Sequence, residues 1–289
     1  MLTPAVLSQI VELMHKGIEE ASIALYPAEH RKHLGASVVG RDCRAYIWNS
    51  FRWLHLEQHN GRMRRLFNRG HREEAAIIEL LIKAGFDVKA ADENGNQFKI
   101  NGCNGHFGGS LDGMTKAPLK FIINDILVLE FKTHGQKSFD DLKKNKVKIA
   151  KPEHWAQMCA YGKPYNIKYA LYIAVNKNDD DIYLELLELD YNYADEIYRR
   201  ATSIIIAKEQ PVKISPTKTF WKCKGCHFSP ICHDGALPEK NCRSCVYAVP
   251  VANGNWNCAN SAITLYTEHL EDELIAVGCN AWKPIINAS

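Results

Sequence analysis

Long hydrophobic runs are missing from this sequence of 289 residues. No apolar stretch approaches the roughly 18 residues that identify a membrane-spanning helix. The first residues also lack the charged, apolar and small-residue segments of a signal peptide. We therefore expect a protein that binds no membrane and stays in the cytoplasm of a prokaryotic or phage-infected host cell.

A strong excess of one charge is missing as well. The chain has 36 lysines and arginines against 33 aspartates and glutamates, which gives a formal net charge of +3. This balance alone does not indicate a nucleic-acid partner, so the placement of the basic residues matters more than their number. The P-loop signature and helicase motifs are absent too, which excludes a motor driven by ATP hydrolysis.

Cysteine, in contrast, is abundant. The chain has ten cysteines, and in a cytoplasmic protein such a number favours metal binding over disulfides. Few apolar residues separate the C-terminal ones, so this region cannot build an adequate core without metal coordination. Six of the ten crowd into one stretch: Cys223, Cys226, Cys232, Cys242, Cys245 and Cys258.

Apolar periodicity predicts helices in the first third of the chain. Residues 4–26 have apolar side chains at helical spacing and end near Pro27. Residues 35–53 predict a helix rich in aromatic residues, with Ser37 as its N-cap and Cys43 within it. Residues 70–85 predict an amphipathic helix that ends at a glycine.

The middle of the chain predicts strands between helices. Residues 119–132 indicate a β-hairpin with its turn at Asn124 and Asp125. Residues 168–175 and 182–188 predict two further strands, of which the first is nearly all apolar and therefore central. Helices are expected at 152–162, 190–208 and near 261–277. This order predicts an α/β sandwich.

Two acidic residues and a lysine end apolar strands. Asp112 closes one apolar run, and Glu130-Phe131-Lys132 closes a second. Strand alternation places Val128 and Glu130 on one face, and Leu129 and Phe131 on the other. Two carboxylates brought together repel each other, and a divalent cation relieves the repulsion. Lys132 can orient a water or stabilise charge on a phosphate. The pattern predicts a metal-dependent phosphodiester-cleaving site, although a strand that simply ends in solvent has the same pattern.

Two helices add further candidates. His71 and Glu74 are three residues apart, so they share a helix face and could supply an imidazole and a carboxylate to a metal. Gln157 and Tyr161 are four apart and share a face of the next helix. Taken alone, each pair is more often structural than functional.

Basic residues gather in two stretches beside these motifs. Arginines at 62–72 alternate with apolar residues, and lysines at 143–151 lie in a stretch with few apolar residues, which predicts a flexible loop. Either stretch is a solvated surface or a surface that binds phosphates. The residues are Arg62, Arg64, Arg65, Arg69, Arg72, Lys143, Lys144, Lys146, Lys148 and Lys151.

In this order the motifs resemble the PD-(D/E)XK nuclease superfamily, in particular its RecB-like branch, over about residues 70–175. That branch carries a histidine-containing helix, an aspartate, an E-x-K and a Q-x-x-x-Y helix. Leu111 stands where the family has a proline, and Gly70 lies directly before His71 and not four residues earlier. The resemblance implies a restriction-endonuclease-like core, with a mixed central sheet flanked by helices.

The resemblance also implies roles for the matched residues. Glu74, Asp112 and Glu130 would hold one or two Mg²⁺ or Mn²⁺ ions, and the carbonyl oxygen of Phe131 and His71 would complete the coordination. Lys132 would position or deprotonate the attacking water. Gln157 and Tyr161 would contact the substrate strand or support Lys132.

The cysteine spacing extends the resemblance. Cys223-x2-Cys226-x5-Cys232 looks like the tail of the iron–sulfur nucleases of this branch, such as CRISPR-associated Cas nucleases and AddAB-type helicase–nucleases. In them a fourth cysteine comes from an upstream helix rich in arginine and aromatics, and Cys43 fits that place. The resemblance implies a [4Fe–4S] cluster, with zinc as the competing metal.

Three further cysteines remain. Cys242-x2-Cys245-x12-Cys258 has the spacing of a zinc ribbon or finger, which needs a fourth ligand. His233 is the nearest candidate in a sensible order, and His227 is the alternative. This prediction depends on spacing alone.

Together these features predict a metal-dependent DNA nuclease. An exonuclease that acts on single strands or DNA ends, in recombination, repair or phage DNA processing, is the first hypothesis, and a recombination or single-strand-binding protein could be its partner. A structure-selective endonuclease, a non-catalytic DNA-binding protein and an RNA-acting metal module are the alternatives. We expect an N-terminal helical region (1–69), a nuclease core (70–210) and a cysteine-rich region (211–289).

Overall fold

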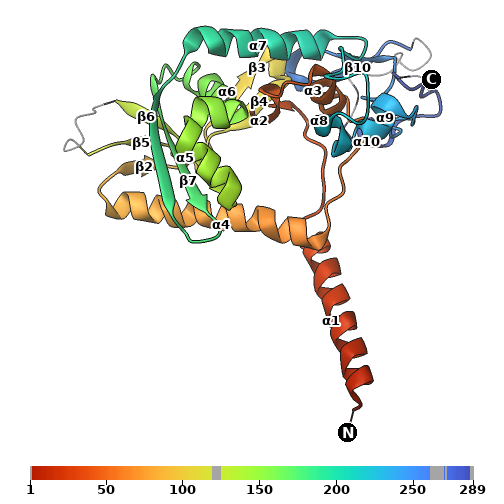
Figure 1. Cartoon of the computed structure of the whole chain (residues 1–289). Helices are drawn as coiled ribbons and strands as arrows, with labels where there is room; N and C mark the ends of the chain where they lie inside the picture. The colour runs from red at the N-terminus through yellow and green to blue at the C-terminus, as the bar shows by residue number, and fades with distance from the viewer. Residues whose placement is uncertain (1, 119–124, 261–269, 271, 287–289) are drawn as a thin grey trace.

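The computed structural model describes residues 2–118, 125–260, 270 and 272–286. Its N-terminal helix α1 (Pro4–Leu25) projects away from the rest of the chain (Figure 1). Arg65 of the next long helix ties the end of α1 in place, since its guanidinium contacts Glu19 at 3.1 Å and Ser22 at 2.9 Å. Apolar side chains such as Leu13 and Met14 remain exposed along α1.

A five-stranded mixed sheet forms the centre of the fold. Its strands lie in the order β2 (Asp87–Lys89), β5 (Gly113–Lys116), β6 (Ile126–His134), β7 (Tyr169–Asn176) and β8 (Ile182–Glu188). Only β6 and β7 pair in parallel, with Glu130 opposite Tyr172, and every other neighbouring pair is antiparallel. The predicted mixed α/β architecture is confirmed.

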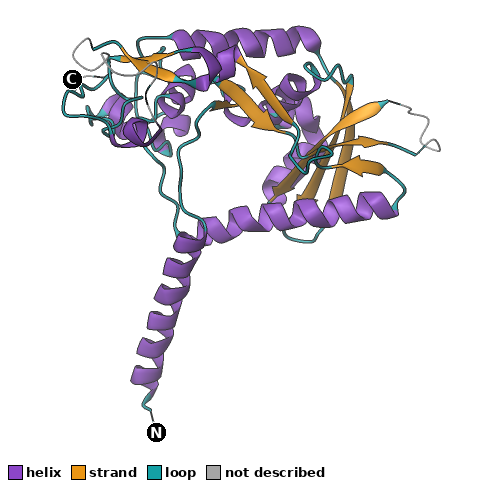
Figure 2. Cartoon of the chain, turned by 180° about the vertical axis from the view of Figure 1, so that it is seen from behind, coloured by secondary structure: helices purple, strands orange, loops and turns teal. Residues whose placement is uncertain are grey.

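Helices cover both faces of this sheet. Leu127, Leu129 and Phe131 of β6 pack with Ile77 and Leu81 of α4 (Gly61–Lys83), which runs along one side of the sheet (Figure 2). Val128 faces the opposite side and packs with α5 (Gln136–Ala150) and α6 (Pro152–Gly162). The predicted alternation along β6 is therefore confirmed.

A smaller sheet links the N-terminal segment to the core. It has the order β1 (Leu34–Gly35), β4 (Phe107–Ser110) and β3 (Lys99–Gly102), followed by the 3-10 turn η1 (Cys103–Gly105) after β3. The short helices α2 (Ala36–Val39) and α3 (Arg44–Phe51) lie beside it, and α7 (Tyr191–Ile206) spans the top of the molecule in Figure 1.

The cysteine-rich region packs on the same core. It contains α8 (Trp221–Lys224), α9 (Ser229–His233), the paired strands β9 (Ala248–Pro250) and β10 (Trp256–Cys258), the 3-10 turn η3 (Ala252–Gly254) and α10 (Asp272–Val277). Phe228 and Trp256 are buried in the cluster that also contains Trp48 of α3. The first and last parts of the chain therefore share one hydrophobic core.

Three local predictions need correction. Residues 35–53 form two helices and not one, because the helical conformation is interrupted between Val39 and Arg44. Cys43 caps the second helix, since its sulfur accepts the N–H of Tyr46 at 3.4 Å. The lysine run is helical within α5, because Phe139, Leu142 and Val147 supply a buried face. The antiparallel partner of β6 is β5, which ends at Lys116 and so lies before the expected hairpin at 119–132. Residues 119–124, which hold the expected first strand and Asn124 of the expected turn, lie outside the described residues.

Helix boundaries also differ from expectation. α4 begins at residue 61, where the side chain of Asn60 accepts the N–H of Met63 at 3.0 Å, so the arginine-rich stretch and the amphipathic helix are continuous. The expected boundary between residues 69 and 70 falls inside this helix. Most of the helix expected near 261–277 lies outside the described residues. Within the described part of that range, residues 272–277 are helical. Within the described part of the chain, no helix is long and apolar enough to cross a membrane.

Candidate active site

Glu130 and Lys132 project from β6 toward α6. The Glu130 side chain is completely buried, and its Oε2 atom accepts a hydrogen bond from Gln157 Nε2 at 3.1 Å. The ammonium of Lys132 forms an ion pair with Oε1 of Glu130 and donates to the Phe131 carbonyl at 3.0 Å. A cation thus already lies between two of the predicted metal ligands.

Asp112 reaches the same point from the connection between β4 and β5. Its Oδ2 atom accepts the backbone N–H of Phe131 at 2.7 Å, which fixes the carboxylate beside β6. Leu111 anchors this connection, because its side chain is buried and its N–H donates to the Phe98 carbonyl at 2.9 Å. The residue at the family's proline position is therefore part of the core.

α4 supplies Glu74 from the other face of the sheet. Burial raises the pKa of Glu74, and the nearby carboxylate of Asp112 raises it further. His71 lies one turn earlier, with its Nδ1 atom 3.7 Å from Glu74 Oε2, and its side chain is 76% exposed. His71 therefore lies at the rim of the site, and Glu74 lies inside it.

Gln157 and Tyr161 support Glu130 from α6. Gln157 Nε2 also lies 3.2 Å from the Tyr161 hydroxyl, so the amide connects that hydroxyl to the carboxylate. Gly109 of β4 makes room for this arrangement, because a Cβ atom there would lie 2.6 Å from the hydroxyl. The structure brings together all six residues that the motifs single out: Glu74, Asp112, Glu130, Lys132, Gln157 and Tyr161.

The electrostatics of the site are dominated by burial. Burial raises the pKa of Glu130 to about 8, although Lys132 opposes the rise. Burial alone would lower the pKa of Lys132, but the carboxylates of Glu130 and Asp112 raise it by more. When the three acidic side chains are ionised, their charge exceeds that of the one ammonium, so a bound cation would stabilise their ionised forms.

Two cavities share one lining residue, and the first of them borders the site. One, of about 360 Å³, is lined by His71, Glu74 and Lys132. A second, of about 570 Å³, is lined by Arg31 and Arg64. Phe67 of α4 lines both and its side chain is 45% exposed.

The motifs missed a buried polar network behind Glu130. His154 Nδ1 and His134 Nε2 lie 2.9 and 3.0 Å from the hydroxyl of Tyr172, the residue paired with Glu130 on β7. Burial lowers the pKa of His154 to about 2 and that of His134 to about 4. His154 lies three residues before Gln157 on the same helix, and this spacing was the sequence signal that could have placed His154 near Glu130.

Most of the basic residues that could bind phosphate already have partners within the protein. Arg64 is buried and donates to the His59 carbonyl at 3.4 Å. Arg69 pairs with Glu73 at 3.2 Å. In the second stretch, Lys143 pairs with Asp181 at 2.9 Å. These contacts favour a structural role for much of both stretches.

The first cysteine group surrounds a cavity of about 490 Å³, lined by Cys43, Cys223, Cys226 and Cys232. Hydrogen-bond donors point at two of these sulfurs: Tyr46 N–H lies 3.4 Å from Cys43 Sγ, and Asn49 Nδ2 lies 3.4 Å from Cys232 Sγ. His233 lines this same cavity. The structure therefore brings together the four cysteines of the predicted cluster.

The second cysteine group has a different fourth member. Cys242, Cys245 and Cys258 line a small cavity together with Cys279, a residue that the spacing argument did not use. Burial raises the pKa of Cys242 to about 11, and the neighbouring thiol of Cys279 adds to the rise. Neither His233 nor His227 lines this cavity. Among the described residues, no group of three or more His, Cys, Asp or Glu side chains is arranged to hold a metal ion as the side chains stand.

Comparisons with known proteins give distant structural likenesses. No family model matches the chain, and no curated protein matches its sequence. The chain is similar to SSO0001, with 17% identity, a TM-score of 0.47, and coverage of 76% of this chain and 96% of that chain.

It is also similar to the alkaline exonuclease LHK-Exo from Laribacter hongkongensis, with 17% identity, a TM-score of 0.42, and coverage of 64% of this chain and 90% of that one. The complex of LHK-Exo with dAMP gives 18% identity, a TM-score of 0.42, and coverage of 60% and 86%. At such scores two chains can share part of a fold without sharing a function.

Proposed function

We propose that this protein is a deoxyribonuclease that depends on Mg²⁺ or Mn²⁺ and removes nucleotides from DNA ends. The observation that carries the proposal is the completely buried carboxylate of Glu130, which faces Asp112 and Glu74 and is held by Gln157. Burying a carboxylate beside two others costs free energy. A divalent cation offsets this cost, and hard oxygen ligands are the ones that Mg²⁺ and Mn²⁺ prefer.

The donor atoms are of the kind that such a cation takes, although the described side chains as they stand are not arranged around one. Lys132 places its ammonium against Glu130 and the Phe131 carbonyl, so this point already attracts positive charge. The Glu130 Oε1 atom is buried, and the group that contacts it is the ammonium of Lys132. Glu74, Asp112, Glu130 and the Phe131 carbonyl would hold the ion, with His71 at the rim.

The metal would supply Lewis-acid stabilisation of the charge that develops on the phosphate. The chain's own residues do the rest. The ammonium of Lys132 can donate a hydrogen bond to the attacking water and orient it, and a neighbouring carboxylate can accept the proton of that water. Gln157 fixes Glu130, and Tyr161 fixes Gln157. The exposed ring of Phe67 can stack on a base of the substrate strand.

We further propose that the first cysteine group holds a [4Fe–4S] cluster. Four thiols around one cavity are the donor set of such a cluster, and the cavity of about 490 Å³ is much larger than a single ion. Hydrogen bonds to Cys43 and Cys232 would tune the sulfurs. The cluster would tie the N-terminal region (1–69) to the cysteine-rich region (211–289), both of which flank the proposed nuclease core (70–210) in the sequence.

Digestion of three labelled DNA substrates tests the activity. Purified protein would be incubated with linear single-stranded, linear double-stranded and circular single-stranded DNA, each with and without Mn²⁺. An exonuclease releases mononucleotides from linear DNA only. A structure-selective endonuclease is favoured instead if the circle is cut, and binding without cleavage of any substrate would reject catalysis.

A matched variant separates the protein's own activity from a contaminant. Glu130→Gln keeps the shape of the side chain and the contact with Gln157 but removes the charge that attracts the cation. Glu188→Gln changes an exposed carboxylate on β8 and serves as its control. Release of nucleotides should disappear in the first variant and persist in the second.

A further inference from the structure

Four cysteines outside the proposed active site and cluster share a cavity of their own. Cys242 and Cys245 are buried, Cys258 and Cys279 are partly buried, and all four line a cavity of about 20 Å³. The rest of the lining is aliphatic or aromatic and consists of Tyr247, Ala248, Leu270, Ala281 and Trp282. The thiols are therefore the main groups that could bind a ligand there.

The backbone around Cys242 and Cys245 has the form of a tight turn. The N–H of Cys245 donates to the Cys242 carbonyl at 3.0 Å, and the N–H of Ala248 donates to the Cys245 carbonyl at 3.2 Å. β9 and β10 then pair so that Cys258 lies opposite Ala248. A turn followed by a short hairpin therefore brings the third cysteine back to the first two.

Cys279 lies in the C-terminal segment, whose backbone comes close to the backbone at Asn241. Gly278 has φ of +72°, and a Cβ atom there would lie 3.2 Å from the Asn241 backbone. Glycine is suited to both demands. The N–H of Lys283 also lies 3.4 Å from Cys245 Sγ. The segment at 278–283 is thus fitted against the turn that carries Cys242 and Cys245.

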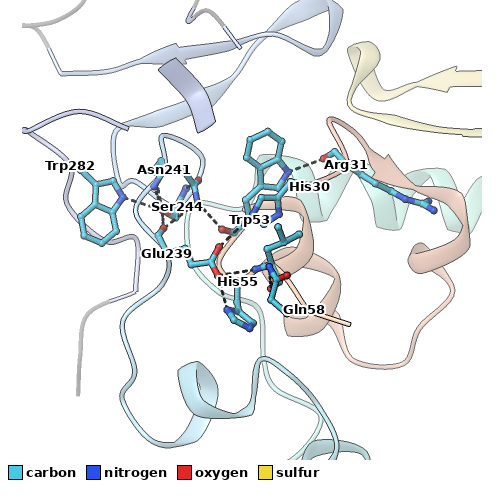
Figure 3. A network of polar contacts seen from close by, with 10 residues as sticks. His30, Arg31, Trp53, His55, Gln58, Glu239, Asn241, Ser244 and Trp282 are labelled. Atoms are coloured by element: carbon cyan, nitrogen blue, oxygen red, sulfur yellow. Dashed lines mark hydrogen bonds and ion pairs between the residues drawn. The ribbon is translucent and has the colours of Figure 1, made fainter. Parts of the chain in front are cut away.

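A network of hydrogen bonds holds this turn in place (Figure 3). Asn241 Nδ2 donates to the Trp53 carbonyl at 2.8 Å, and the Asn241 side chain accepts the Ser244 N–H at 2.9 Å. Trp282 Nε1 donates to Ser244 Oγ at 3.0 Å. On the other side, Glu239 contacts His55 at 2.8 Å. The turn is therefore fixed to both the N-terminal segment and the C-terminal segment.

We propose that Cys242, Cys245, Cys258 and Cys279 hold one structural zinc ion. Four thiols are a closed zinc donor set. A cavity of about 20 Å³ has room for roughly one water-sized sphere, and so for a single ion but not for an iron–sulfur cluster. The first group's cavity of about 490 Å³ provides the contrast.

Cys279 takes the place that spacing assigns to His233, because His233 lines the cavity of the first group. The side chains as they stand do not hold an ion, so binding requires the thiols to lose their protons and rotate inward on a backbone that already gathers them. The ion would join the hairpin to the C-terminal segment, in addition to the apolar contacts between them.

Differential alkylation of the unmodified full-length protein tests the ligand set without any mutation. Native protein would be treated with iodoacetamide before and after removal of metal by a zinc chelator, and each cysteine would be followed by peptide mass spectrometry. We expect all four cysteines, Cys279 included, to be protected until the chelator is added. Cys103, half-buried and outside both groups, should react equally before and after. Equal reactivity of Cys279 before and after would overturn the proposal.

Metal analysis of variants then identifies the ion. The wild type should contain about one zinc per chain, and Cys279→Ser should lose it while His233→Asn and Cys103→Ser keep it. Cys279→His should restore zinc, because histidine is also a zinc ligand, and this variant covers the case in which Cys279→Ser does not fold. The assignment would be overturned if His233→Asn lost zinc while Cys279→Ser kept it. It would also be overturned if the Cys43→Ser variant, in which the first cysteine group lacks one ligand, contained iron and no zinc.

Discussion

The ammonium of Lys132 lies against the completely buried carboxylate of Glu130, and both belong to the strand β6. The strand places them on one face because they are two positions apart, with one residue between them. α6 closes that face with Gln157, and the connection before β5 adds Asp112. Three separate parts of the chain thus converge on a pair that a single strand supplies.

The first prediction concerns this pair. Asp112→Asn, Glu130→Gln and Lys132→Met should each lower the rate of nucleotide release by at least ~10²-fold, because each removes a group assigned to the metal or to the attacking water. The measurement is release of labelled nucleotides at saturating Mn²⁺, with circular dichroism to verify folding. Near-normal cleavage by folded Glu130→Gln would contradict the proposed site.

The second prediction concerns Gly109, which touches no substrate. Gly109→Ala would put a Cβ atom 2.6 Å from the Tyr161 hydroxyl and displace it from Gln157. Because a misplacement of about 1 Å can cost about 10²-fold in rate, we expect a loss of activity of ~10- to 10²-fold. Gly17→Ala, on exposed α1 with nothing near the new atom, is the control and should leave the rate unchanged.

A double-mutant cycle shows whether the loss runs through Tyr161. Tyr161→Phe removes the atom nearest to the new methyl group and leaves ring carbons at 3.0 and 3.2 Å, so Gly109→Ala should cost less in the Tyr161→Phe background than in the wild type. Rates for the two single variants and the double variant provide the measurement. Losses that simply add would show that Gly109 acts by another route.

The sequence predicted the parts of this protein that depend on local pattern. Alternation along residues 126–132 predicted which residues of β6 face each side, and apolar periodicity predicted α7 and β8 to within about two residues. The lysine-rich stretch was taken for a loop because lysines outnumber its apolar residues. Phe139, Leu142 and Val147, spaced to share one face, were enough to make it a helix once α5 packed on the sheet.

Long-range contacts were harder to predict. Nothing near Cys279 marks it as a partner of Cys242, because the two are brought together by Gly278 and by the fit of the last segment on Asn241. The network of His154, Tyr172 and His134 was missed for the same reason, since its members lie on α6, β7 and β6. The division into three regions and the functional roles of the site residues remain predictions.

The third prediction concerns the first cysteine group. Anaerobically purified protein should be brown and absorb broadly in the visible range, because thiolate-to-iron charge transfer colours [4Fe–4S] clusters. Cys43→Ser should remove the colour and most of the iron, whereas Cys103→Ser should keep both. Iron analysis and the visible spectrum are the measurements. Colourless wild-type protein without iron would reject the cluster.

The fourth prediction concerns stability at acid pH. Burial, together with nearby lysines, lowers the pKa of His154 to about 2 and of His134 to about 4, whereas an unfolded chain has histidine pKa values near about 6.5. Between these values the unfolded state binds more protons than the native state. The two histidines therefore contribute fully to the free energy of unfolding above about pH 6.5. As the pH falls from that value toward about 4, the free energy of unfolding decreases by about 1.4 kcal/mol per pH unit for each histidine.

Urea unfolding at pH 7.5 and pH 5 measures this loss in the wild type and two variants. His154→Gln removes one buried imidazole, so the free energy of unfolding should fall less between the two pH values than in the wild type, even if the variant is less stable at pH 7.5. His15→Gln removes an exposed imidazole on α1 and should show the wild-type difference. If the free energy of unfolding changed by the same amount between the two pH values in all three proteins, His154 would gain its proton as readily in the native state as in the unfolded chain. The buried network would then not keep it neutral.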